Sequence, residues 1–190
     1  MQAIFPGPER FIPMSMFIAI PTVHRAAWFG HNLCSLSSAY PETKTQGLGT
    51  LSKTLGLKCF GPTRLYGATQ WDSSSLHIHL KYGPLKLVTA WTPAHTHVAT
   101  LTYRMDLSHD VLLHSLQDSA GKRGPEPSEW VLPQDHLRYQ EIQRAIEARS
   151  AAFMIPSRPA VKRDKLMNPI LQYAPKSFDD DGTGELALGS

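Results

Sequence analysis

Residues 75–92 have the sequence SLHIHLKYGPLKLVTAWT, which carries the clearest structural signal in the chain. Apolar and polar side chains alternate on both sides of Gly83-Pro84, and this period of two is typical of a half-buried strand. The alternation returns at residues 97–104, after the turn signal Thr92-Pro93. We therefore expect a three-stranded antiparallel meander over residues 75–105, with its first turn at Gly83-Pro84.

Two helices are expected after the meander. Asp106 or Ser108 can cap a short helix over the apolar run that follows them. Asp135 is the candidate N-cap of the main helix, which we expect to run over about residues 135–154 and to end before Pro156. One helix packed on a small antiparallel sheet makes the predicted fold class α+β.

The segments outside this region are richer in proline and glycine. Residues 41–70 are rich in Gly, Thr and Lys, and we expect them to form a loop with short pieces of strand. Residues 1–155 are predicted to form a single globular domain, with an extended, Pro-rich arm at its N-terminal end. Residues 156–190 are predicted to form an extended or disordered C-terminal tail, because so polar and Pro-rich a segment buries little apolar surface by itself.

Length and composition limit the class of protein. The 190 residues are 42% hydrophobic and 18% charged, which suits one globular domain. The apolar run over residues 14–20 is far shorter than the roughly 20 residues of a membrane-spanning helix, so no transmembrane segment is expected. Cys34 and Cys59 form no CxxC pair and no disulfide framework. We therefore expect an intracellular chain, cytoplasmic or mitochondrial.

Charge is distributed unevenly along the chain. Over residues 1–71, six basic residues stand against only Glu9 and Glu42, a formal charge of +4. Such a segment suits an anionic partner such as RNA or a lipid surface, a mitochondrial presequence, or a solvated basic face with no partner. No RNP1, KH or zinc-finger pattern is present, so RNA would be bound without sequence specificity. The candidate anion-binding residues are Lys44, Lys53, Lys58 and Arg64.

Histidine is the residue type that stands out. His77 and His79 are two positions apart, so on a strand both would leave the same face, and a suitable turn would bring His97 beside them. These three residues are candidate zinc ligands, or the centre of a histidine-based hydrolase or phosphoesterase. Against this, the predicted strands carry no carboxylate, and a shift of one residue would turn His97 to the other face. Solvent-facing histidines, with no cofactor, are the simpler interpretation.

Other motifs fail on inspection. Residues 47–54 (GLGTLSKT) come within one residue of a phosphate-binding loop, but Ser52 replaces the second glycine and the preceding residues are not strand-like. The acidic run over residues 179–181 lacks the ligand spacing of a calcium loop. There is no GxSxG elbow around any serine. No residue is therefore assigned a catalytic role.

These observations favour a non-catalytic structural or accessory subunit of a larger assembly, such as a ribonucleoprotein, an organellar complex or a viral particle. It would dock on other protein subunits through its basic N-terminal region and its C-terminal arm. Two alternatives stay open. One is a metal-dependent or histidine-based enzyme of the hydrolase or phosphoesterase type, and the other is a non-specific RNA-binding protein.

Overall fold

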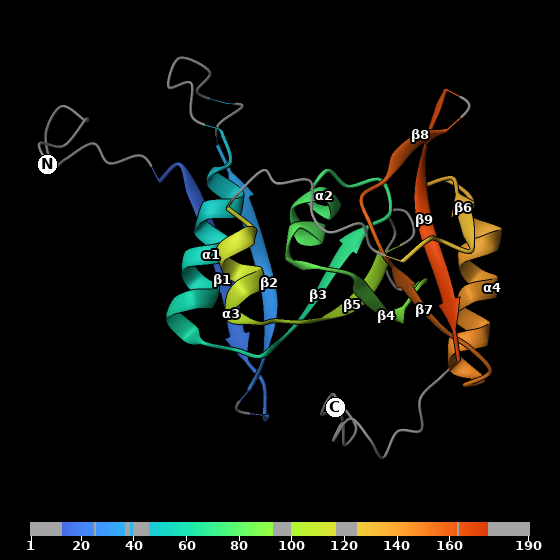
Figure 1. Cartoon of the computed structure of the whole chain (residues 1–190), viewed down its shortest axis with the longest axis horizontal. Coiled ribbons are helices and arrows are strands. Elements are labelled where there is room, and N and C mark those ends of the chain that lie inside the picture. Colours follow the sequence, from blue (N-terminus) through green and yellow to red (C-terminus); the bar gives the residue numbers. More distant parts are fainter. Residues whose placement is uncertain are drawn as a thin grey trace, which may run out of the picture.

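The computed structural model describes residues 13–24, 26–36, 39, 46–92, 100–116, 125–162 and 164–174. Within these residues the chain forms one large sheet with a few helices packed against it (Figure 1). The strand order is β1-β2-β3-β5-β4-β7-β9-β6, and β8 pairs with β9. The strands are β1 (Ser15–Pro21), β2 (Ala27–Ser35), β3 (Arg64–Gln70), β4 (Leu85–Thr89), β5 (Thr100–Asp106), β6 (Glu129–Val131), β7 (Ala152–Ile155), β8 (Ala160–Lys162) and β9 (Lys165–Tyr173).

The helices lie between these strands in the chain. They are α1 (Leu48–Phe60), α2 (Ser75–His79) with the 3₁₀ turn η3 (Leu80–Tyr82), α3 (His109–His114) and α4 (His136–Glu147). Figure 1 shows α1 and α3 beside the β1–β2 end of the sheet and α4 at the opposite end. None of the helices in the described part of the chain is long and apolar enough to cross a bilayer.

The predicted mixture of helices with an antiparallel sheet is confirmed, but the sheet is large rather than small. It has nine strands, and each described pairing is antiparallel except that of β2 with β3. Strands β4 and β5 pair as neighbours, as the meander requires. The predicted N-terminal arm over residues 1–12 and the tail beyond residue 174 lie outside the described residues.

The first strand of the predicted meander is wrong, because residues 75–82 are helical. The buried side chains in this stretch are Leu76, His79 and Tyr82, which are three positions apart and so share one side of a helical turn. In so short a window the same apolar residues fit a period of two as well. Packing of every third side chain into the core, rather than the local alternation, decides between helix and strand.

The helix caps were predicted more accurately. The Ser108 side chain accepts a hydrogen bond from the backbone N–H of Val111 at the start of α3, and Asp135 accepts one from Arg138 at the start of α4. Helix α4 ends at Glu147, however, and not near residue 154, because the chain turns after it and continues as β7.

Residues 41–70 were predicted to be a loop with short pieces of strand, and this is wrong for α1, whereas β3 is a strand within this segment. Helix α1 is bounded by Gly47 and Gly61, whose φ angles of 74° and 64° are left-handed. Glycine adopts this conformation without a steric penalty, so the two glycines delimit the helix instead of marking an irregular loop.

The extended tail predicted from residue 156 is also wrong as far as Tyr173. Strand β9 pairs with β6, β7 and β8, and its Asn168 is fully buried. The Asn168 amide donates hydrogen bonds to the carbonyl oxygen of Trp71 (3.0 Å) and to the Tyr139 hydroxyl (3.1 Å). The rings of Trp71 and Tyr139 stack with centroids 4.0 Å apart. Strand β9 is therefore tied to the centre of the core.

The parallel pair β2–β3, connected through α1, is the unit that shapes the functional site. The two strands pair only over Ala27–Gly30 and Arg64–Gly67. Beyond these residues β2 continues alongside β1, and β3 continues alongside β5. The strands therefore separate toward their carboxyl ends, which is where open α/β sheets commonly form ligand crevices.

We predict that Asn168→Ala lowers the free energy of unfolding by about 1 to 2 kcal/mol, because it removes two buried hydrogen bonds. Gln172→Ala, at an exposed position of the same strand, should change it by less than about 0.5 kcal/mol. Urea unfolding of both variants measures the difference. Equal effects would mean that β9 is not tied to the core in this way.

Candidate functional site

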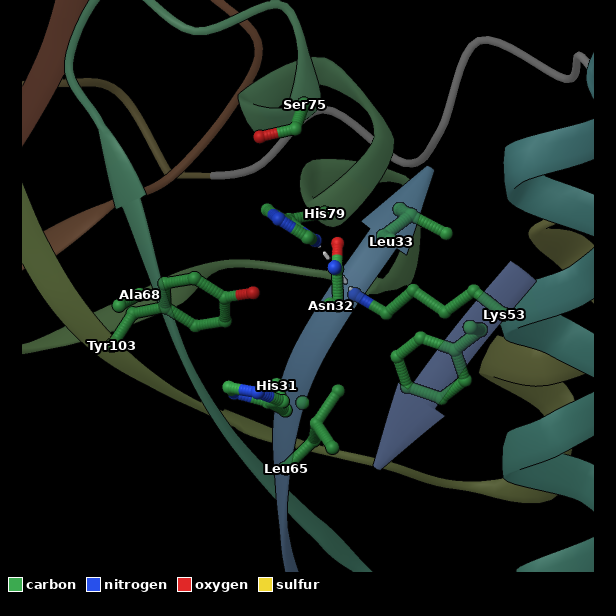
Figure 2. Close-up of a pocket in the computed structure, with 11 residues that line it drawn as sticks. His31, Asn32, Leu33, Lys53, Leu65, Ala68, Ser75, His79 and Tyr103 are labelled. Carbon is green, nitrogen blue, oxygen red and sulfur yellow. Dashed lines mark hydrogen bonds between the residues drawn. The ribbon is translucent and has the colours of Figure 1, made fainter. Parts of the chain in front are cut away.

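A cavity of about 160 Å³ lies where β2 and β3 separate. Its walls come from both strands, from β1, β5, α1 and α2, so it is built by segments far apart in the sequence (Figure 2). The lining residues are Phe17, Gly30, His31, Asn32, Leu33, Lys53, Leu65, Ala68, Ser75, His79 and Tyr103.

Lys53 enters this cavity from α1, and its position reverses the usual pattern of an amphipathic helix. The lysine is 0% exposed, whereas Leu51 and Leu55 of the same helix are 41% and 51% exposed. Burying an amine while two leucines face solvent is unfavourable by hydrophobicity alone. Local rules are most often broken in this way at functional sites.

Two side chains contact the Lys53 amine. Its Nζ lies 2.7 Å from Nδ1 of His79 and 4.6 Å from the centroid of the Tyr82 ring. Among the described residues that line the cavity there is no Asp or Glu. Burial therefore lowers the pKa of Lys53 from its ordinary value of 10.5 to about 7. Near neutral pH a large share of the amine is uncharged and carries a free lone pair.

His79 comes from α2 and is 7% exposed. Burial, and secondarily the charge of Lys53, holds the pKa of His79 well below its ordinary value of 6.5. The imidazole is therefore neutral at pH 7. When Lys53 is protonated, Nδ1 of His79 must accept from it, and the ring proton then lies on Nε2.

A network of buried hydroxyl groups holds α1 in place behind the lysine. The Thr54 hydroxyl lies 2.8 Å from the Tyr82 hydroxyl and 2.9 Å from that of Ser115. Tyr82 also donates to the carbonyl oxygen of Thr50 at 3.0 Å. These contacts join α1 to η3 and to the end of α3, and so set the depth at which Lys53 enters the cavity.

Tyr103 of β5 supplies a second polar group. Its ring centroid lies 5.1 Å from that of His79, and its hydroxyl points into the cavity (Figure 2). The ring passes over Gly67 of the neighbouring strand, where a Cβ atom would come within 2.6 Å of Tyr103 Cζ. Only glycine leaves this space open.

The Tyr103 hydroxyl is a proton donor at physiological pH. Tyr103 is 2% exposed, and burial raises the pKa of its phenol far above the ordinary value of 10. Its hydroxyl makes no hydrogen bond with any residue that the structure describes. The hydroxyl faces the open space of the cavity, so a ligand held there can accept a hydrogen bond from it.

The mouth of the cavity is formed by β2. His31 is the extra residue of a bulge, since Ile18 pairs with Asn32 and the next residue of β1 pairs with Gly30. Both His31 and Asn32 are exposed. Bulges frequently redirect side chains beside active sites. Here the bulge coincides with the point at which β2 leaves β3.

The predicted zinc ligands do not come together as a strand face. His79 lies in the cavity wall against Lys53, and His77 lies on the same helix but does not line the cavity. His97 lies outside the described residues, so the zinc hypothesis stays a prediction. Among the described residues, no three His, Cys, Asp or Glu side chains are grouped in a way that could hold a metal ion.

The predicted anion-binding residues are also divided. Lys44 lies outside the described residues, Lys53 is buried, Lys58 is exposed and Arg64 is half-buried. Lys53 and Lys58 therefore cannot share one surface. Sequence reasoning did not single out Tyr103, and it grouped Lys53 with other cations without indicating that its side chain is buried. One signal was available, because Lys53 is the only charged residue between Gly47 and Leu57.

No family model matches this chain, and neither a curated protein nor a solved structure matches it. The site therefore has to be interpreted from its own geometry and chemistry.

We predict that the free energy of unfolding rises between pH 7 and pH 9 by up to about 1.4 kcal/mol per pH unit. The folded pKa of Lys53, about 7, lies below its ordinary value of 10.5. Over this window the unfolded chain binds a proton that the folded chain does not, so stability increases with pH. Lys53→Met should abolish the slope, and Lys58→Met, an exposed lysine of the same helix, should retain it. Urea unfolding at several pH values measures both, and an unchanged slope in Lys53→Met would contradict the assignment.

Proposed function

We propose that this protein is an enzyme that acts on a small carbonyl compound, with Lys53 as the amine nucleophile. The observation that carries the proposal is the Nζ of a fully buried lysine in the wall of a cavity, 2.7 Å from Nδ1 of His79. Lysines that are desolvated in this way are used as Schiff-base nucleophiles, because the amine loses its proton near neutral pH.

The first step is addition of the amine to the carbonyl carbon. The Nζ lone pair forms the new C–N bond, and the π electrons of the carbonyl move to its oxygen. A proton then passes from the nitrogen to that oxygen, and the hydroxyl group takes up a second proton from solvent and leaves as water while the protonated C=N bond forms. No oxidant or reductant is needed, since the only product besides the Schiff base is water.

His79 is placed to move the proton in this step. Its Nδ1 contacts the attacking nitrogen, and its lowered pKa keeps the imidazole neutral and able to accept a proton at pH 7. Once the protonated Schiff base has formed, it withdraws electrons from the adjacent carbon. The reaction classes that follow are those that cleave or form a bond at that carbon, such as proton abstraction, decarboxylation or aldol cleavage.

We predict that propionaldehyde with sodium cyanoborohydride alkylates Lys53 of the full chain at pH 7 at least about tenfold faster than Lys58. A solvated lysine is almost entirely protonated at this pH, whereas about half of Lys53 is not. The labelling of Lys53 should be half-maximal near pH 7. Peptide mapping by mass spectrometry measures both sites in the same sample.

Lys58 lies on the same helix as Lys53 but is exposed, so it reports on ordinary amine reactivity within the folded protein. His79→Gln retains a hydrogen-bonding side chain without a titratable base, and it should slow the labelling of Lys53 but not that of Lys58. If Lys53 is labelled no faster than Lys58, the amine is not a nucleophile and the proposal fails.

A second function, the accessory subunit, is favoured by a separate observation. Large apolar side chains are exposed at the end of the molecule formed by β1, α1 and α3, including Ile18, Leu51, Leu55 and Leu113. Such surfaces commonly dock on other proteins. The surface lies largely within the basic N-terminal region expected from the sequence, but these exposed side chains are apolar, and the burial of Lys53 weakens the RNA-binding alternative. The C-terminal arm of that hypothesis lies outside the described residues.

This second function predicts that the chain purifies from its source at moderate salt in a stoichiometric complex. Leu55→Lys should release it, because a charge would then have to be buried in the interface. Leu137→Lys is the matched control, since Leu137 is 75% exposed on α4 at the other end of the sheet. Native mass determination follows both variants. A wild-type chain that purifies alone contradicts the subunit function and leaves the enzyme proposal untouched.

A further inference from the structure

The unpartnered hydroxyl of Tyr103 indicates what the cavity holds. This residue is nearly fully buried, its hydroxyl is directed into the cavity, and it finds no hydrogen-bond partner among the described residues (Figure 2). Because its phenol stays protonated, it can donate to an oxygen of a bound molecule. The cavity is thus arranged for a ligand with a hydrogen-bond acceptor at Tyr103 and a reactive carbon at Lys53.

The charge of the site limits the kinds of ligand further. A protonated Schiff base on Lys53 would be a buried cation, and none of the residues that line the cavity is a carboxylate. A buried charge without a partner is strongly unfavourable. The described lining residues therefore offer no counterion at this point, and a negative group on the substrate would supply it.

We infer, building on the proposed function, that the substrate is a short α-keto acid whose carboxylate accepts a hydrogen bond from the Tyr103 hydroxyl. The carbonyl carbon lies beside Lys53, and its oxygen leaves as water when the Schiff base forms. The carboxylate stays in the cavity throughout and faces the cationic nitrogen. Tyr103 is accordingly a binding residue for the carboxylate.

The size of the cavity suits a substrate with a short carbon chain. Pockets for drug-sized ligands have volumes of roughly 300–1,000 Å³, and this cavity has about 160 Å³. The apolar lining residues Phe17, Leu33 and Leu65 suit a short alkyl group on the carbonyl carbon. Pyruvate, with one methyl group, is the natural probe.

The test compares pyruvate with methyl pyruvate in reductive trapping with sodium cyanoborohydride on the full chain at pH 7. The neutral ester has the more electrophilic ketone, so amines in solution react faster with it. In the wild-type protein, pyruvate should nevertheless label Lys53 at least about tenfold faster than the ester does. The pyruvate carboxylate accepts a charge-assisted hydrogen bond from Tyr103 and neutralises the cationic Schiff base, and the ester does neither. Peptide mapping locates and quantifies the adduct.

Tyr103→Phe keeps the ring and removes the hydroxyl. It should slow the trapping of pyruvate by about tenfold and that of methyl pyruvate by much less, because a neutral ester oxygen accepts a weaker hydrogen bond than a carboxylate. Circular dichroism and the urea unfolding midpoint confirm that the variant is folded. Equal labelling by acid and ester in the wild type would overturn the keto-acid inference while the carbonyl chemistry stands. No selective labelling of Lys53 by pyruvate, methyl pyruvate or propionaldehyde would overturn both.

Discussion

Lys53 lies on the buried side of α1 while Leu51 and Leu55 of the same helix face solvent. An amine in that position has no carboxylate among the groups that surround the cavity, and its contacts are a neutral imidazole and the face of an aromatic ring. Burial of the charged form is therefore unfavourable, and the amine loses its proton more easily, so the pKa of Lys53 is about 7. The hydroxyl network behind α1 holds the helix in this orientation, and the reactivity of the site follows from the resulting position of Lys53.

The supporting structure is a parallel pair of strands that separates soon after it forms. Strand β2 turns toward β1 through the bulge at His31, while β3 continues beside β5. Side chains from α1, α2 and β5 line the cavity between the two strands. Gly67 lacks the side chain that would block Tyr103. Lys53, His79 and Tyr103 thus come from three different elements, and the site exists only when the sheet, α1 and α2 are assembled. Because the packing that stabilises the fold also buries Lys53, the stability of the protein and the reactivity of this amine depend on the same contacts.

Sequence reasoning succeeded where the decisive contact is local. The Ser108 and Asp135 caps bond to backbone groups three residues away, and the pairing of β4 with β5 follows from alternation in neighbouring segments. It failed at residues 75–82, where strand and helix periods fit the same apolar residues, and at β9, whose long-range pairing and Asn168 contacts cannot be detected from a polar, Pro-rich composition. The prediction that His77 and His79 lie on one face of a strand is wrong for the same reason, because residues 75–82 are helical.

The sequence by itself determined the mixed fold class, the helix starts and the unusual isolation of one lysine in an otherwise uncharged segment, because these depend on residue type and short spacing. Only the tertiary structure decided that this lysine points inward, that His79 meets it at 2.7 Å and that Tyr103 reaches the same cavity over Gly67. The partners are 26 positions apart for Lys53 and His79, and no local pattern encodes which side of a helix a distant residue will meet. Packing against the whole core selects that side, and with it the chemistry available to the protein.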